Sequence, residues 1–239
     1  EARITFLVKA LGLDQFRPLV EDDWQNLKNG PNTITEDELD RVKQFFTEPS
    51  YQTNVKSTLE EHQNNKPFTQ WLLRCTHEHK VEGYRSVTLS LKPYNVAPGD
   101  VTSAQMKIVA DLSDQFSFGE IRVSHEQNLI FADVRENDLF ELWEKLKIHN
   151  LATPNVGLLT DIICCPGGDF CSLANAKSIP IADSIQQVFD DMDYLHEIGD
   201  IDLNISGCMN ACGHHHVGHI GILGVDKDGS EWYQVTLGG

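Results

Sequence analysis

The chain has 239 residues, of which 40% are hydrophobic and 8% aromatic, a composition typical of a globular protein with one large or two ordinary domains. Its formal net charge of −17 argues against nucleic acid and anionic membranes as partners, because both bind basic patches. No apolar run approaches the roughly 18 residues that cross a bilayer, and no signal peptide is expected.

The first 66 residues are expected to form a helical linker segment. Apolar residues at helical spacing predict a helix over residues 2–11. Thr35 is expected to cap another helix, with Glu38 completing a capping box. Residues 47–66 are polar and are expected to be exposed. The sequence opens inside a helical pattern and without methionine, so we expect a fragment of a longer protein.

Residues 67–150 alternate strand and helix patterns. The expected order is strand, strand, helix, strand, strand, helix, over residues 69–76, 84–91, 102–114, 120–123, 129–134 and 137–147. This order predicts an α+β layer, with helices packed on one face of a largely antiparallel sheet. Cys75, His77 and His79 would share one face of the first strand, but one strand alone is weak support for a metal site.

The last segment, residues 151–239, contains no arginine and only two lysines, Lys177 and Lys227. Strands are predicted over residues 156–163 and 201–205, a strand hairpin over 217–225 and 231–237, and helices over 172–178 and 182–195. The first two strands would each lead into a loop that carries cysteines.

Five of the six cysteines lie in one stretch of this segment. Cys165 and Cys171 form a C-x5-C pair, and Cys208 and Cys212 form a C-x3-C pair that one turn of helix would place on a single face. Four thiolates from two loops predict a soft metal centre, either zinc or an iron–sulfur cluster. Thiols in this pattern suit a reducing, cytoplasmic setting, and a disulfide framework is not expected in a chain of this size.

Zinc remains an alternative, as the metal of a zinc-stabilised binding module without catalysis. Histidines follow the second pair directly, and cysteine and histidine together are common zinc ligands. The five residues between Cys165 and Cys171 make a wide gap for a zinc site, however, and suit a loop around a larger cluster.

The two motifs, C-x5-C from Cys165 and G-C-x-N-x-C-G from Gly207, resemble those of siroheme-dependent sulfite and nitrite reductases. The resemblance implies that Cys165, Cys171, Cys208 and Cys212 hold a 4Fe-4S cluster. It also implies that Cys212 bridges the cluster to the siroheme iron. The remaining cysteines, Cys164 and Cys75, have no role in this pattern, and a simple 4Fe-4S electron carrier without siroheme is a further alternative.

A second resemblance lies upstream, in residues 119–129, which are similar to a hairpin of the ferredoxin-like half-domain of the same reductases. It implies that Arg122 and Gln127, with Asn128 beside them, face the siroheme carboxylates. Asn210, between two cysteines, is expected to donate a hydrogen bond near the cofactors. The alternatives are an ordinary surface hairpin and an asparagine that caps a helix.

One departure from the family concerns the residues after the last cysteine. Members often carry arginine just after the final Cys-Gly, whereas this chain has His214. We therefore assign no cofactor role to His214, His215, His216 and His219.

The fold that the resemblance implies is α+β: a ferredoxin-like half-domain over residues 67–150, followed by an α/β siroheme/4Fe-4S-binding domain over 151–239 that is truncated at its C-terminus. The implied function is the C-terminal part of an assimilatory-type oxidoreductase that reduces sulfite to sulfide or nitrite to ammonia. Its expected partners are a missing N-terminal half, a ferredoxin or flavoprotein electron donor, and the anion. No catalytic residue is predicted in this half, and the fragment alone is expected to be inactive.

Overall fold

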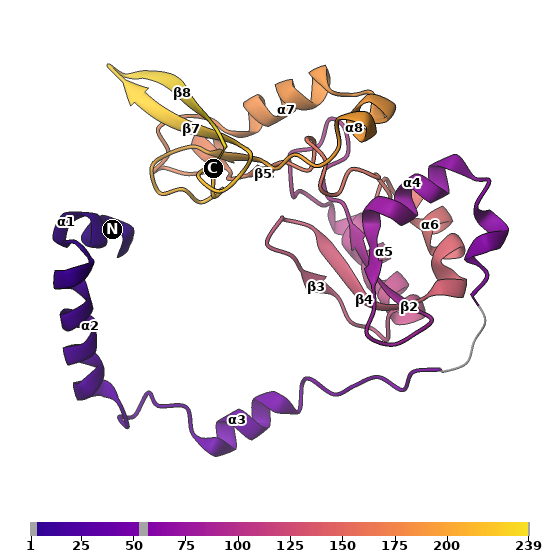
Figure 1. The fold of residues 1–239 in the computed structure, drawn as a ribbon, viewed down its shortest axis with the longest axis horizontal. Helices are drawn as coiled ribbons and strands as arrows, with labels where there is room; N and C mark the ends of the chain where they lie inside the picture. Colours follow the sequence, from indigo (N-terminus) through magenta and orange to yellow (C-terminus); the bar gives the residue numbers. More distant parts are fainter. Residues whose placement is uncertain (1–3, 53–56, 239) are drawn as a thin grey trace. The chain divides into compact units, whose positions relative to one another are not determined.

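The computed structural model describes residues 4–52 and 57–238, and it divides into two units, Glu1–Ser50 and Tyr51–Gly239. The first unit consists of three helices (Figure 1): α1 (Ile4–Leu11), α2 (Leu13–Leu27) and α3 (Glu36–Lys43). The side chains described in α2 and α3 are all at least partly exposed. The Thr35 hydroxyl accepts the Glu38 N–H at 3.2 Å, so the predicted cap of α3 is confirmed.

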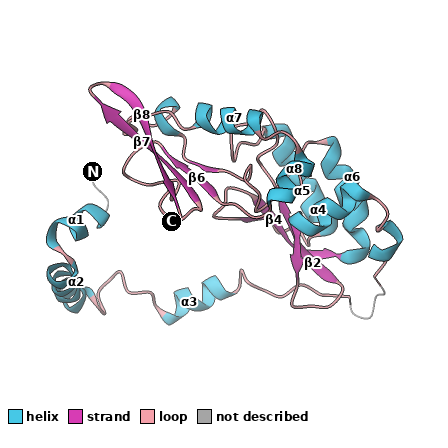
Figure 2. Ribbon diagram, turned by 45° about the horizontal axis from the view of Figure 1, so that its top comes forward, coloured by secondary structure: helices cyan, strands magenta, loops and turns pink. Residues whose placement is uncertain are grey.

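The second unit begins with an antiparallel sheet whose strand order is β1-β2-β4-β3. Its strands are β1 (Thr76–Glu78), β2 (Tyr84–Leu89), β3 (Arg122–Val123) and β4 (Leu129–Arg135). Three helices pack with this sheet around one core (Figure 2), namely α4 (Lys66–Cys75), α5 (Ser103–Phe116) and α6 (Leu139–Ile148). Short 3-10 turns precede α4 and α6, at η1 (Leu59–His62) and η2 (Glu136–Asp138). The predicted α+β class is confirmed.

The strand expected over residues 69–76 is wrong, because this stretch is helix α4. The side chain of Asn65 accepts the Phe68 N–H at 3.2 Å and so caps the helix. Phe68, Trp71 and Cys75 recur at helical spacing and are fully buried. Of the expected strand only Thr76 lies in a strand, as the first residue of β1, which pairs with β2.

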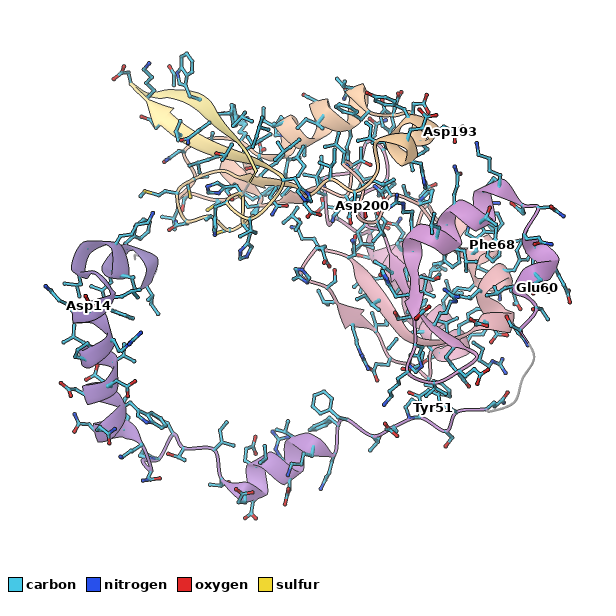
Figure 3. The ribbon with its side chains drawn as sticks, viewed as in Figure 1. Asp14, Tyr51, Glu60, Phe68, Asp193 and Asp200 are labelled. Carbon is cyan, nitrogen blue, oxygen red and sulfur yellow. The ribbon has the colours of Figure 1, made fainter. Side chains whose placement is uncertain are left out.

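The polar stretch before α4 is partly packed, where we expected it to be exposed. The Tyr51 hydroxyl, labelled in Figure 3, donates to the buried Asp133 carboxylate at 2.7 Å. Further along, the His62 ring stacks on Phe140 with 3.8 Å between ring centres. These contacts attach the described part of residues 51–65 to the half-domain core.

A second sheet carries the cysteine-rich part of the chain, with strand order β5-β6-β7-β8. Its strands are β5 (Ile163–Cys164), β6 (Leu203–Ser206), β7 (Ile220–Lys227) and β8 (Ser230–Leu237). The first three strands run parallel, and β8 returns antiparallel to β7 as the predicted hairpin. Helices α7 (Ile179–Val188) and α8 (Met192–Ile198) complete its core.

Three predicted elements of this part differ in the structure. Turns occupy residues 156–162, so the strand expected there is reduced to β5. Turns also replace the short helix expected over residues 172–178. The long helix expected over residues 182–195 is two helices, because Asp191 caps a new start at α8 by accepting the Asp193 N–H at 2.9 Å. No described helix is both long and apolar enough to cross a membrane.

A buried ion pair joins the two sheets of the second unit. Lys92 Nζ lies 2.5 Å from Asp161 Oδ1, and the two side chains are 0% and 6% exposed. The Asp161 carboxylate also accepts from Asn128 Nδ2 at 3.1 Å and from the Gly157 N–H at 2.9 Å. Burial lowers the pKa of Lys92, and the Asp161 carboxylate opposes that shift.

Surface ion pairs join the same two parts. Lys66 Nζ lies 2.9 Å from the Asp193 carboxylate, and Arg74 pairs with Asp200. Both aspartates are labelled in Figure 3, on the part of the chain that carries the cysteines. The ferredoxin-like layer and the cysteine-bearing sheet are thus bonded at several points.

Candidate metal centre

Parallel pairing of β5 with β6 brings the two cysteine loops to one edge of the sheet. Ile163 pairs with Asn204, and Cys164 with Ile205. The first loop leaves β5 at Cys165 and the second leaves β6 at Gly207, and the carboxyl ends of parallel neighbours lie side by side. The topology therefore places both motifs together, although about 40 residues separate them.

The two loops contact each other through Gly207. Its N–H donates to Cys165 Sγ at 3.0 Å, and its carbonyl accepts the N–H groups of Asn175 at 2.9 Å and Ala176 at 3.0 Å. A Cβ on Gly207 would stand 2.7 Å from the Ala176 carbonyl oxygen and 2.8 Å from Gly167 Cα. Only glycine fits there, so the close approach of the loops is fixed by sequence.

The first loop is further held by Ser178, the residue before α7. A Cβ on Gly167 would lie 2.4 Å from the Ser178 nitrogen, so the loop and the helix start are in direct contact. Ser178 is fully buried, and its Oγ lies 3.5 Å from Cys165 Sγ. On its outer side the loop is held by β8, where the Tyr233 hydroxyl donates to the Lys177 carbonyl at 2.9 Å.

The four predicted ligands differ in exposure. Cys208 is buried, Cys165 and Cys171 are half-buried, and Cys212 is exposed. The helical turn expected over Cys208–Cys212 is wrong: this stretch is a sequence of turns, and Ala211 has a φ of 55° that no right-handed helix accommodates.

The two other cysteines are buried and bond to backbone carbonyls. Cys164 is buried and its Sγ donates to the Cys165 carbonyl at 3.3 Å, while burial raises the pKa of its thiol to about 12. Cys75 is fully buried in the half-domain, with its Sγ 3.4 Å from the Thr153 carbonyl, and burial raises its pKa strongly. His77 and His79 do not join it, since the His79 ring pairs with Asp133 at 3.1 Å.

The chemistry of this donor set fits an iron–sulfur cluster. No disulfide joins the six cysteines, and four of them lie on two loops that glycine packing holds together. The sulfurs do not form a closed site, because no three His, Cys, Asp or Glu side chains among the described residues are gathered closely enough to hold one ion. The four thiols and the placement of their loops therefore fit a cluster. Among the described residues, however, the sulfur atoms are not gathered into one binding site.

Gln127 of the half-domain hairpin is bonded to the first cysteine loop. Its Oε1 accepts the Cys164 N–H at 2.8 Å, and its Nε2 donates to the Cys164 carbonyl at 2.9 Å. Gln127 has a φ of 60°, and a Cβ on Gly99 would stand 3.1 Å from the Gln127 Cβ. The amide acts like one more strand partner for β5, a role that sequence reasoning missed.

The other predicted siroheme contacts lie in different surroundings. Arg122 is exposed on β3 and its Nε lies 2.5 Å from the Glu120 carboxylate. Asn128 is buried and its Oδ1 accepts the Leu91 N–H at 3.0 Å. Asn210 is half-buried in the turn between two cysteines, and no helix starts there in the described chain. The siroheme role of all three, and of Gln127, stays a prediction.

The histidines after the last cysteine lie in the turns that precede β7. His214 and His216 are exposed, with 6.3 Å between ring centres, and His215 is half-buried with its pKa lowered by burial and by His216. His219 Nδ1 accepts the Asp202 N–H at 2.9 Å. The carbonyl of His215 would lie 1.9 Å from a Cβ on Gly221, so this loop also depends on a glycine.

Positive charge is scarce around the cysteine loops. Lys177 Nζ lies 3.5 Å from the Asp169 carboxylate, and Lys227 lies 5.2 Å from the centre of the Trp232 ring. Residues 151–239 thus offer two lysines and no arginine, and one of the lysines is already paired with a carboxylate.

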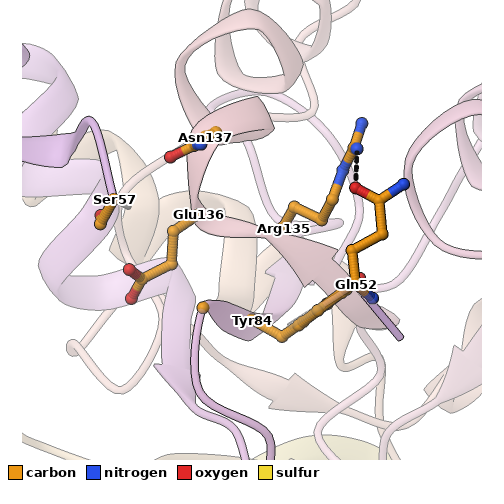
Figure 4. A pocket seen from close by; sticks show the side chains of 7 residues that line it. Gln52, Ser57, Tyr84, Arg135, Glu136 and Asn137 are labelled. Carbon is orange, nitrogen blue, oxygen red and sulfur yellow. Dashed lines mark hydrogen bonds between the residues drawn. The ribbon is translucent and has the colours of Figure 1, made fainter. Parts of the chain in front are cut away.

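A small pocket lies elsewhere, on the half-domain (Figure 4). Its wall includes Gln52, Tyr84, Arg135, Glu136 and Asn137, with Arg135 donating to Gln52 at 3.0 Å. Its inner volume of about 10 Å³ admits about one water molecule. It is too small to hold a cofactor.

Comparison with known proteins agrees with this architecture. Residues 77–148 match the family described as the nitrite/sulfite reductase ferredoxin-like half domain. These residues contain the antiparallel sheet and helices α5 and α6. This part of the chain is therefore similar to the half domain of the nitrite/sulfite reductases, the family that the cysteine motifs resemble, and the α+β class is confirmed.

Individual relatives support the same family. The chain is 30% identical over 151 residues to the assimilatory ferredoxin-dependent nitrite reductase of Haloferax mediterranei, covering 61% of this chain and 26% of that protein. It is 25% identical to sulfite reductase (ferredoxin) 1 of Mycolicibacterium paratuberculosis, over 100% of this chain and 38% of the relative. The chain thus spans well under half the length of these relatives, which are oxidoreductases.

A solved structure shows the same fold. The Mycobacterium tuberculosis NirA protein superposes on 100% of this chain with a TM-score of 0.57, at 22% sequence identity and over 39% of its own length. At this identity the match describes the arrangement of the backbone.

Proposed function

We propose that this chain is the cluster-bearing part of a ferredoxin-dependent sulfite or nitrite reductase. Cys165, Cys171, Cys208 and Cys212 would hold a 4Fe-4S cluster, and Cys212 would also bridge to siroheme. When bound, the two coupled groups would pass electrons one at a time from the donor protein to the anion, in the six-electron reduction of sulfite or nitrite.

One observation carries the proposal: the two cysteine loops leave neighbouring parallel strands and are bonded to each other at Gly207 and Cys165. A zinc-stabilised module needs ligands on two adjacent loops as well, but the C-x5-C spacing and the match of residues 77–148 to a reductase half domain favour the cluster. Both relatives above carry ferredoxin in their names, which supports ferredoxin as the electron donor.

The chain's own residues contribute position and shielding. Gln127 holds the backbone beside Cys165 from the half-domain, and the Gly207 N–H donates to the Cys165 sulfur. The buried pair of Lys92 and Asp161 fixes the half-domain against the segment that leads into β5. Arg122 is the cation of the hairpin and would face a siroheme carboxylate in exchange for its present partner, Glu120.

Metal analysis tests the proposal. The chain is purified without oxygen, reconstituted with ferrous iron and sulfide, and examined for bound iron, acid-labile sulfide and visible absorption. We expect about four iron and four sulfide per chain and a broad visible band. Uptake of zinc in place of iron, with a colourless protein, would establish the binding module instead.

Siroheme binding separates the reductase from a simple electron carrier. In the protein that also contains the rest of a reductase, Arg122→Ala is expected to lower siroheme occupancy and leave cluster iron intact, because a charge-assisted contact to a carboxylate is lost. Lys145→Ala, at another exposed ion pair on α6, serves as the control. Unchanged siroheme occupancy in Arg122→Ala would make Arg122 a surface residue.

A further inference from the structure

A serine hydroxyl is buried against one of the cysteine sulfurs. Ser178 is fully buried, and Cys165 Sγ, at 3.5 Å, is the hydrogen-bond partner that the described structure gives its Oγ. Hydrogen bonds to sulfur are longer than those to oxygen, so this distance is a bonding one. A thiolate that holds metal has no proton, so in that state only the hydroxyl can donate.

The position of Ser178 in the helix makes its contact with sulfur unusual. It is the N-cap residue of α7, where a serine hydroxyl commonly accepts a backbone N–H of the first turn. In the described structure Ser178 makes no such capping bond, and its backbone has a φ of −107° and a ψ of −41°. The hydroxyl is therefore directed to the sulfur instead of to the helix.

Two glycines leave space for the hydroxyl at this position. A Cβ on Gly167 would lie 2.6 Å from Ser178 Oγ, and a Cβ on Gly207 would lie 3.1 Å from the same atom. These glycines come from the first and second cysteine loops respectively. The hydroxyl thus sits where both loops meet, in space that a side chain on either glycine would occupy.

We propose that Ser178 is a positioning residue for the cluster, whose hydroxyl donates a hydrogen bond to the Cys165 thiolate and makes the cluster easier to reduce. The inference rests on the proposed cluster. Together with the Gly207 N–H at 3.0 Å, it gives Cys165 two donors. Hydrogen bonds to ligand sulfur withdraw negative charge and stabilise the reduced cluster, which raises its reduction potential.

The test compares reduction potentials in the reconstituted 239-residue chain. Ser178→Ala removes the donor with little change in shape and is expected to bind as much iron as the unmodified chain. Its cluster is expected to have a lower midpoint potential, with about a tenfold change in the ratio of oxidised to reduced cluster at the original midpoint, or about 59 mV for one electron. Redox titration followed by absorption and electron paramagnetic resonance measures this shift.

Two further variants complete the design. Ser178→Thr keeps a hydroxyl and is expected to restore the original midpoint. Ser184→Ala removes a hydroxyl on the same helix that donates to the Pro180 carbonyl at 2.7 Å, and is expected to change nothing. Equal midpoints in Ser178→Ala and the unmodified chain, at equal iron content, would refute the inference and leave the cluster standing. If the unmodified chain takes up zinc and no iron, the cluster and the inference are both refuted.

Discussion

Cys164 and Cys165 are adjacent in sequence but have different surroundings. The Cys164 sulfur is buried within β5 and bonds to the neighbouring carbonyl, whereas the Cys165 sulfur receives the Gly207 N–H from the second loop. One residue of register therefore separates a core thiol from a ligand candidate. The sequence alone does not show which of the two adjacent cysteines is the ligand, so the choice of Cys165 rested on the family resemblance.

We expect serine substitution of Cys165, Cys171, Cys208 or Cys212 each to lower reconstituted iron severely, because one iron loses its protein ligand. Iron and sulfide are quantified for each variant after reconstitution. Cys164→Ser and Cys75→Ser are the matched controls, and both are expected to keep the iron content of the unmodified chain. Loss of iron in Cys164→Ser with retention in Cys165→Ser would contradict the register.

Ser178, Gly207 and the bond from Gln127 to Cys164 lay beyond sequence reasoning for a physical reason. Each acts through a partner that is distant in sequence, and no local pattern encodes such a pairing. Gln127 was assigned to the right hairpin from the family resemblance, but its amide bonds to a backbone 37 residues away.

At the scale of elements, most helices and strands were predicted from the sequence. The errors lie where a capping residue, and not the spacing of apolar residues, determines where a helix begins. Asn65 followed by Pro67 marks a helix start, and attention to that pair would have changed the strand expected over residues 69–76. Asp191 likewise breaks an apolar stripe that continues through α7 and α8. The parallel order of β5, β6 and β7 depends on pairing between distant segments and could not be derived locally.

The close packing of the two cysteine loops predicts that a single added methyl group, at Gly207, lowers stability and iron uptake. In Gly207→Ala the new Cβ would press on the Ala176 carbonyl and on Gly167, so we expect a loss of about 1–3 kcal/mol in unfolding free energy. Iron uptake is expected to fall as well, since the loops are forced apart. Thermal or urea unfolding and iron quantification measure the two effects.

Gly168→Ala is the matched control for this substitution. Gly168 belongs to the same loop, but a Cβ there meets its nearest neighbour at 3.4 Å, an ordinary contact. We expect near-normal stability and iron content. Similar losses in Gly168→Ala and Gly207→Ala would show that the loop tolerates no side chain anywhere, and that the crowding at Gly207 is not special.

The buried ion pair between the two sheets predicts a second stability effect. Lys92→Met leaves the Asp161 carboxylate buried without its cation and is expected to cost about 3–5 kcal/mol of unfolding free energy. Urea unfolding followed by circular dichroism measures it. Lys66→Met, at the exposed pair with Asp193, is the control and is expected to change stability little. A loss in Lys92→Met no greater than in the control would mean that the buried pair does not join the sheets.

At the scale of the whole molecule, the shortage of positive charge limits how well the chain by itself can bind siroheme and reduce an anion. Siroheme and sulfite are anionic, and residues 151–239 offer two lysines and no arginine, with Lys177 already paired with the Asp169 carboxylate. Relatives are two to four times as long as the matched region. We therefore expect the 239-residue chain to fold and take up iron, but to bind siroheme weakly and to reduce neither anion at a measurable rate.

A direct assay checks this expectation. Sulfite and nitrite reduction with a chemical reductant is measured for the chain reconstituted with siroheme, iron and sulfide, beside an intact reductase. Heat-treated chain gives the background rate. Turnover close to that of the intact enzyme would overturn the expectation and would mean that the cations needed for the anions lie within this chain.

The position of β6 in the chain also sets the order of events during synthesis. The pairs β1–β2 and β3–β4 close over short stretches, but β6 can pair with β5 only after α7 and α8 have been made. Cys165 and Cys171 therefore leave the ribosome on the order of seconds before Cys208 and Cys212, at about 5–20 residues per second. During that interval the nascent chain presents two of the four proposed ligand thiols, so a cluster can be completed only after the second loop has been made.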